Sequence, residues 1–265
     1  MEAHSLHIAV DITNPDHYGE SMLLSCGKID AALMGGRANK SKAYKSTTYL
    51  LDQAATKNNV TRALSEFARL TQQNPQEVYY FYISATCHGF SYEESRHGGE
   101  DGHLEFLCLY DQMILEHELR EMLTWFDKNA IIFFVLGSCY AGGIFSEDLS
   151  KALPTDGEPD VIRINRKHYE ALIKRHYGSI HSYKAQGITL SASPKDGTAS
   201  EAGSREPSLF TGKFIDVLTE DFTGNYQDLR DMMACKLPEQ PPILRRLDES
   251  NSCYFKTSIP VFINH

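Results

Sequence analysis

A cysteine and a histidine follow two strongly apolar stretches of the chain. Cys139 comes shortly after the run Ala130–Leu136, and His88 comes shortly after the run Val78–Ser84. A cysteine attacks carbonyl carbons as the thiolate, so it needs a neighbour that accepts its proton. An imidazole can accept that proton and later give it to a leaving amine. These two residue types therefore predict acyl-transfer chemistry at a thiol.

Both apolar runs have the length and composition of strands that are buried on both faces. They are rich in β-branched and aromatic residues and are too short for a core helix. If the two strands are parallel neighbours, their carboxyl ends lie at one edge of a sheet, where ligands bind in α/β proteins. Small residues beside Cys139, such as Gly137 and Gly142, leave room for a substrate backbone.

The rest of the chain alternates between expected strands and helices. Before Cys139 we expect strands at Leu6–Ile12, Ser46–Leu51 and Glu105–Tyr110, and helices at Met22–Met34, Thr56–Leu70 and Leu115–Trp125. Gly35-Gly36 is expected to end the first helix, and Asn74-Pro75 the second, while Ser91–His103 is expected to form a loop. The alternation predicts an α/β fold with a mainly parallel central sheet and helices on both faces.

The sequence beyond Cys139 predicts a single domain, residues 1–265, built from three parts. Residues 1–145 form the first part, residues 146–186 a linker or surface excursion with one helix around Tyr169–Arg175, and residues 187–265 the last part. The last part is expected to hold a strand at Gly187–Ser193, helices at Leu209–Leu218 and Tyr226–Cys235, and a closing strand at Tyr254–Ile263.

The motifs around the cysteine and the histidine resemble those of the caspase and metacaspase clan of cysteine peptidases. Cys87-His88-Gly89 is similar to the Ser/Gly-His-Gly motif, and residues 137–142 resemble the metacaspase motif Asp-Ser-Cys-His-Ser-Gly. The separation, 139 − 88 = 51 residues, matches the spacing of caspases. Looser similarities follow in the order of the family at Lys28–Leu33, Tyr110–Leu119, Ile188–Ser193 and Leu209–Phe214.

The resemblance implies a caspase-like fold and an endopeptidase that works through a Cys139–His88 dyad and a thioester acyl-enzyme. It implies that the backbone N–H groups of Gly89 and Cys139 stabilise the oxyanion. It also implies substrate-binding roles for Asp30 and Ser191, and no cofactor. Asp30 matches an acidic pocket residue of metacaspases, which predicts a basic residue before the scissile bond (P1).

Three positions depart from the family patterns. Gly137 stands where metacaspases carry an aspartate that helps to line the pocket for a basic residue. Leu24 and Ser200 fall loosely where the arginines of caspases bind an aspartate side chain. A preference for aspartate at P1 is therefore not expected, and a basic preference depends on Asp30 alone. A solvated helix residue is the alternative for Asp30.

Other interpretations of the same residues remain open. Buried cysteines and histidines near strand ends are often purely structural. Cys87, beside His88, is a competing nucleophile, although alternation along a strand should direct it to the opposite face. The chain could also be a catalytically inactive caspase-like interaction module, or an unrelated flavodoxin-like domain. The basic stretch Arg163–Arg175 is either a solvated surface or an activation cleavage site of a zymogen.

The composition of the chain indicates which partners it can bind and in which compartment it is expected. The chain of 265 residues has a formal net charge of −9 and a pI near 5.6, which argues against a nucleic-acid surface. Six cysteines without CxxC spacing indicate reduced thiols in the cytoplasm. We expect no signal peptide, no membrane span and no metal site, although Asp101 and Asp111 leave calcium dependence open. The expected partner is a protein or peptide substrate, and a regulatory protein partner is left open.

Overall fold

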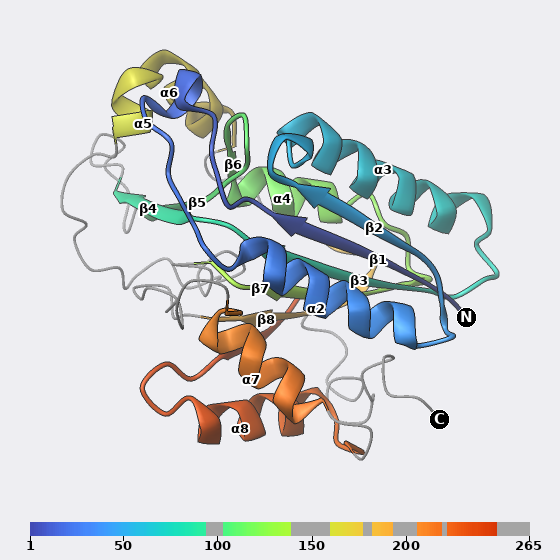
Figure 1. The fold of residues 1–265 in the computed structure, drawn as a ribbon. Coiled ribbons are helices and arrows are strands. Elements are labelled where there is room, and N and C mark those ends of the chain that lie inside the picture. Colours follow the sequence, from blue (N-terminus) through green and yellow to red (C-terminus); the bar gives the residue numbers. More distant parts are fainter. Residues whose placement is uncertain (94–102, 139–159, 177–181, 193–205, 219–221, 248–265) are drawn as a thin grey trace.

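The computed structural model describes residues 1–93, 103–138, 160–176, 182–192, 206–218 and 222–247 (Figure 1). Within this part, six strands form the central sheet, and all are parallel except the last, which is antiparallel to its neighbour. In spatial order they are β2 (Tyr44–Leu51), β1 (Glu2–Ala9), β3 (Tyr79–Thr86), β7 (Ala130–Leu136), β8 (Gln186–Ser191) and β9 (Ile243–Arg246). The predicted mainly parallel sheet is confirmed.

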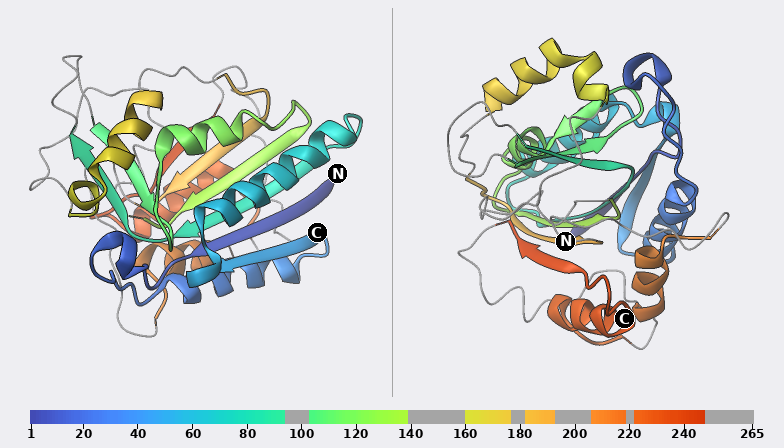
Figure 2. Two further views of the ribbon diagram at one scale, coloured as in Figure 1. Left: turned by 90° about the horizontal axis from the view of Figure 1, so that it is seen from above. Right: turned by 90° about the vertical axis from the view of Figure 1, so that its left-hand side faces the viewer.

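Helices cover both faces of this sheet, as the alternation predicts (Figures 1 and 2). One face packs against α3 (Lys57–Gln73) and α4 (Glu116–Leu123), and the other against α2 (Gly27–Lys40), α7 (Leu209–Val217) and α8 (Tyr226–Lys236). Alternation along β3 serves both layers. Phe81 and Ile83 join the first cluster, while Tyr80 and Tyr82 join the second. Strands buried on both faces explain the continuous apolar runs in the sequence.

A second, smaller sheet lies at the end of the molecule toward which the parallel strands run (Figure 1). Its antiparallel strands are β4 (Gly89–Glu93), β5 (His103–Cys108) and β6 (Met113–Leu115). The strand expected at Glu105–Tyr110 therefore belongs to this sheet, and the first residues of the expected loop, Ser91–His103, form part of β4. Periodicity alone does not tell which sheet a short strand joins.

Residues 160–176 are part of the packed structure around the second sheet. They form α5 (Asp160–Ile164) and α6 (Arg166–His176), and α6 contains the helix expected around Tyr169. Tyr169 is fully buried; its hydroxyl lies 3.0 Å from the backbone N of Met113, which donates to it, and 2.6 Å from Nε2 of His17. This helix therefore joins the second sheet to α1 (Pro15–Tyr18) instead of lying on the surface alone.

The glycine pair at positions 35 and 36 does not end a helix. The prediction that α2 stops there is wrong, because the helix continues to Lys40. A Cβ on Gly35 would overlap the ring of Tyr49 in β2. The glycine thus allows α2 to pack closely on the edge strand. Thr56 does cap α3 as predicted, since its hydroxyl accepts a hydrogen bond from the backbone N of Asn59.

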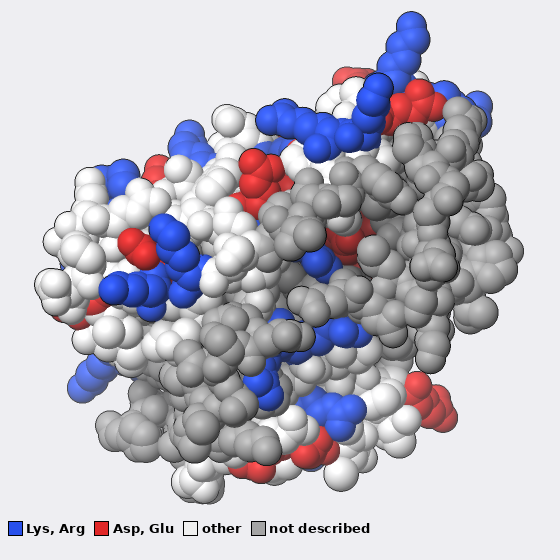
Figure 3. All heavy atoms as spheres, turned by 180° about the vertical axis from the view of Figure 1, so that it is seen from behind, with Lys and Arg blue, Asp and Glu red and all other residues white. Residues whose placement is uncertain are grey.

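No helix within the described residues has the length and apolar character needed to cross a membrane. On the face seen from behind, basic and acidic side chains are interspersed (Figure 3). The closing strand expected at Tyr254–Ile263 lies outside the described residues.

Candidate active site

The strands that precede the two candidate catalytic residues end side by side. β3 and β7 are parallel neighbours, with Ala85 opposite Leu136, and the backbone N of Gly137 donates to the carbonyl of Ala85 at 2.8 Å. The predicted shared edge is thereby confirmed for the strands. His88 follows β3 at this edge. Cys139 lies outside the described residues, so its distance from His88 stays a prediction.

Beyond the Gly137–Ala85 hydrogen bond, a side-chain contact also connects the segments that follow β3 and β7. Sγ of Cys87 lies 3.4 Å from Oγ of Ser138. These residues directly precede His88 and Cys139, and both are buried. Cys87 also belongs to the core cluster of the sheet, and its side chain is only 2% exposed. Its thiol cannot reach a peptide bond without opening the core, so the burial argues against Cys87 as the nucleophile.

The His88 ring is held by a backbone carbonyl. Nε2 of His88 lies 3.0 Å from the carbonyl oxygen of Leu23. A carbonyl oxygen only accepts hydrogen bonds, so Nε2 must carry a proton and donate it. In the neutral ring the other nitrogen, Nδ1, is then the acceptor. The contact therefore selects the tautomer in which Nδ1 can take up a proton.

The segment that carries this carbonyl is itself fixed. The backbone N of Leu24 donates to the carbonyl of Asp11 at 2.9 Å. Met22 donates its backbone N to the hydroxyl of Thr13 at 2.9 Å, and its carbonyl accepts from the backbone N of Thr13. Because Leu23 is flanked by these hydrogen bonds, its carbonyl is a rigid acceptor for the imidazole.

Gly89 is placed so that its N–H points away from the second sheet. The carbonyl of His88 accepts a hydrogen bond from the backbone N of Cys108 at 2.9 Å, and Gly89 pairs with Leu107 in the next register position. Hydrogen-bonded and non-hydrogen-bonded pairs alternate in an antiparallel ladder. The Gly89–Leu107 pair is therefore non-hydrogen-bonded, so the N–H of Gly89 points away from β5. This orientation is consistent with the oxyanion role that the family resemblance implies, which stays a prediction.

Asp30 is buried and bridges three elements. It lies in the first turn of α2 with no exposed surface. Its carboxylate accepts from the backbone N of Ser208 at 2.9 Å, from the Ser208 hydroxyl at 2.7 Å, and from the Thr86 hydroxyl at 3.2 Å. The alternative of a solvated helix residue is wrong, because these three donors hold the carboxylate between α2, the end of β3 and the start of α7.

Within the described ranges, the charge of Asp30 is stabilised by hydrogen-bond donors and not by a cation. Burial raises the pKa of the Asp30 carboxyl above its ordinary value, and hydrogen bonds from Ser208 and Thr86 oppose that rise. Among the described residues, no Lys, Arg or His forms an ion pair with Asp30. The carboxylate thus supplies a negative potential close to the carboxyl end of β3.

Gly137 is required by its neighbour. A Cβ at this position would stand 2.8 Å from Oγ1 of Thr86, closer than side-chain atoms normally approach. The same hydroxyl donates to Asp30. A glycine in place of the metacaspase aspartate therefore leaves space for the threonine that holds Asp30.

Ser191 lies at the same edge of the sheet. It ends β8, pairs with Leu136 of β7, and has a buried side chain. Its predicted contact with a substrate stays a prediction.

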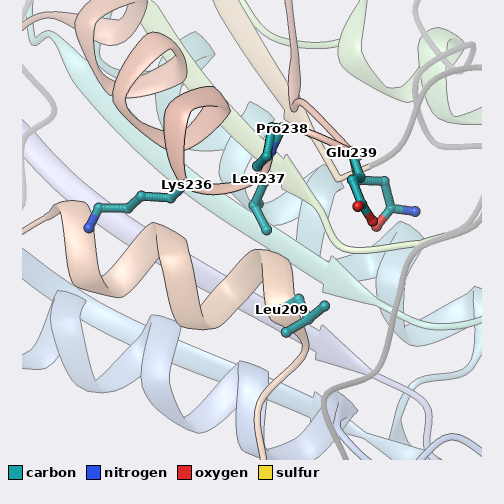
Figure 4. A pocket seen from close by; sticks show the side chains of 6 residues that line it. Leu209, Lys236, Leu237, Pro238 and Glu239 are labelled. Carbon is teal, nitrogen blue, oxygen red and sulfur yellow. The ribbon is translucent and has the colours of Figure 1, made fainter.

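A separate cavity of about 470 Å³ opens where α8 ends and α7 begins (Figure 4). Its lining contains none of the predicted site residues; it consists of Leu209, Lys236, Leu237, Pro238, Glu239 and Gln240.

In the described part of the chain, no cluster of three His, Cys, Asp or Glu side chains is arranged to hold a metal ion. Asp111 instead accepts a hydrogen bond from the backbone N of Lys57 at 2.9 Å. Asp101 lies outside the described residues, so calcium dependence stays open.

The family of this chain follows from a match over most of its length. The model of the caspase domain matches residues 8–252. The chain belongs to the caspase-domain family. Among solved structures, this family member resembles the protein GSU0716 from Geobacter sulfurreducens, with 20% identity, a TM-score of 0.81 and full coverage of both chains. It also resembles caspase-1 from Spodoptera frugiperda, with 11% identity and a TM-score of 0.54, over 92% of this chain and 87% of that one.

These similarities show the caspase fold, and together with the family they support a cysteine-type peptidase. No curated protein matches the chain significantly.

Two residues that contribute to this caspase-like site could not be predicted from the sequence. Leu23 acts through a backbone carbonyl, which every residue has, and Ser208 reaches Asp30 across 178 residues of sequence. For Ser208, the available sequence signal is its position directly before the expected helix Leu209–Leu218, where serine is a typical N-cap.

Proposed function

We propose that this protein is a cysteine endopeptidase in which Cys139 is the nucleophile and His88 the general base and acid. The observation that carries the proposal is the hydrogen bond from Nε2 of His88 to the carbonyl of Leu23, at the edge shared by β3 and β7. A histidine held in this tautomer is suited to take a proton at Nδ1. The family and the fold support the same reaction class.

The proposed reaction proceeds in two halves. Nδ1 of His88 takes the thiol proton, the sulfur of Cys139 bonds to the substrate carbonyl carbon, and the oxyanion accepts hydrogen bonds from the N–H groups of Gly89 and Cys139. The C–N bond then breaks as His88 protonates the leaving amine. A water molecule gives a proton to His88 and attacks the thioester, and the thiol is restored when the C–S bond breaks.

Covalent labelling tests the nucleophile. A peptidyl acyloxymethyl ketone with arginine next to the ketone should form a thioether at Cys139, with loss of its carboxylate. Peptide mass spectrometry should find the adduct at this residue and little at Cys235, which is the exposed thiol of the described residues. Labelling of Cys235 alone in the folded protein would contradict the assignment.

We propose further that Asp30 directs the enzyme to a basic residue at P1. Its charge is buried and has hydrogen-bond donors but no paired cation in the described structure, so its negative potential can attract a substrate Arg or Lys that binds nearby. Protonation would remove the charge. Because burial raises the pKa of Asp30, the preference for a basic residue should weaken as the pH falls, at a higher pH than for an ordinary aspartate.

Asp30→Asn should lower kcat/KM for a P1-Arg peptide by about 10- to 100-fold relative to a P1-Leu peptide, as expected for loss of a buried negative charge close to the substrate cation. Asp216→Asn, on the exposed side of α7, is the matched control and should leave the ratio unchanged. The measurement is kcat/KM for both peptides at several pH values. An unchanged ratio in a folded Asp30→Asn variant would refute the role of Asp30.

A further inference from the structure

Two aliphatic side chains stand exposed beside the candidate general base. Leu23 is 70% exposed and Ile12 is 37% exposed. An antiparallel bridge pairs the two residues. Single exposed aliphatic residues are common on protein surfaces. Here, however, the backbone holds two of them together, and the carbonyl of one contacts the imidazole of His88 at 3.0 Å.

The exposed pair borders a larger apolar surface. Met22, next to Leu23, and Phe90, two residues after His88, are partly buried and pack against the cluster around the second sheet. The hydrogen bonds of Met22 with Thr13 keep this segment in place. The apolar surface beside His88 is therefore continuous with the packed interior, and its position does not depend on a free loop.

The chemistry of the leaving group indicates which part of a substrate reaches this surface. The inference rests on the proposed function, in which His88 protonates the amine of the residue that follows the scissile bond. That residue must then lie next to the imidazole at Nδ1, and the backbone carbonyl of Leu23 contacts the same ring at Nε2. We propose that Leu23 and Ile12 form a subsite for an apolar side chain, such as Leu, Ile or Phe, immediately after the scissile bond.

Internally quenched peptides with a fixed Arg at P1 test this subsite. Three peptides would differ only in the next residue, which is Leu, Ser or Asp. Discrimination by an apolar contact is about 10- to 100-fold, so the wild type should show that preference in kcat/KM for Leu over Ser and Asp. Leu23→Ser should reduce the preference several-fold. The ratio between the peptides is the readout, because any change in the hold on His88 would slow all three peptides alike.

Val78→Ser is the matched control. Val78 is 42% exposed and directly precedes β3, at the opposite end of that strand from His88, so its substitution should leave the preference unchanged. Thermal unfolding would verify that each variant is folded, and Ile12→Ser gives a second variant of the same subsite. If the wild type cleaves the peptides without preferring Leu, or if Leu23→Ser and Ile12→Ser both keep the preference, the subsite is refuted. A wild type that neither cleaves nor is labelled would refute the proposed function, and the subsite with it.

Discussion

Cys139→Ala is expected to abolish peptide hydrolysis, with a loss of about 10⁴-fold or more in kcat/KM. Removal of the nucleophile eliminates the acyl-enzyme pathway, and losses of this order are typical when a member of a catalytic pair is removed. His88→Ala should reduce the rate by a comparable factor, because the thiol then lacks its proton acceptor. The measurement is hydrolysis of a P1-Arg peptide under single-turnover conditions.

The double variant gives the decisive comparison. Residues that act as a unit are non-additive, so Cys139→Ala/His88→Ala should be no slower than the worse single variant. Cys235→Ala removes an exposed thiol on α8 and should keep wild-type activity. If Cys139→Ala retained substantial activity that chromatography could not separate from the protein, another residue would have to be the nucleophile. The inactive-module interpretation would instead gain support from a wild type that fails to cleave any member of a peptide library.

Acidification is expected to destabilise the fold through His7. This residue lies in β1 with no exposed surface, between the rings of Tyr49 and Tyr82. Its Nδ1 is 2.8 Å from the Ser84 hydroxyl, and among the described residues Nε2 has no hydrogen-bond partner. Burial lowers the pKa of His7 to about 3. The folded state therefore holds this ring neutral.

The sign of the effect follows from linkage. Between pH 6.5 and about 3 the unfolded chain binds a proton at His7 that the folded chain does not, so stability falls as the pH falls. At about 1.4 kcal/mol per pH unit, the loss between pH 7 and pH 4 is on the order of 3 kcal/mol. Urea unfolding at the two pH values measures it.

His7→Gln isolates this contribution, because glutamine keeps a hydrogen-bonding group near Ser84 but does not titrate. The variant should be less stable than the wild type at pH 7, and the difference should shrink or reverse by pH 4. His168→Gln, at an exposed position on α6, should leave the pH dependence unchanged. Parallel pH profiles for the wild type and His7→Gln would show that His7 does not cause the acid sensitivity.

Much of the architecture could be predicted because its cause is local. The run Ala130–Leu136 forms β7 with the predicted bounds, since a continuous apolar stretch that ends at a glycine fits a strand buried on both faces. Thr56 and Asn74 bound α3 as expected, because capping chemistry depends on neighbouring residues. The shared edge of β3 and β7 followed from the parallel pattern.

The features that could not be predicted depend on contacts between distant segments. The role of Gly35 requires Tyr49 of another element, and that of Gly137 requires Thr86. The carbonyl of Leu23 has no side-chain signature, although it decides the tautomer of His88. The three-stranded sheet escaped prediction for the same reason, since its pairing is set by tertiary packing and not by periodicity.

The placement of Tyr169 bears on how such a chain could mature. Its ring and hydroxyl hold together segments from before and after the candidate nucleophile. A cut between residues 160 and 176 would break the backbone of a helix pair that packs against the second sheet and α1. An activation cleavage in this stretch, which the sequence leaves open, would therefore have to preserve the contacts of Tyr169.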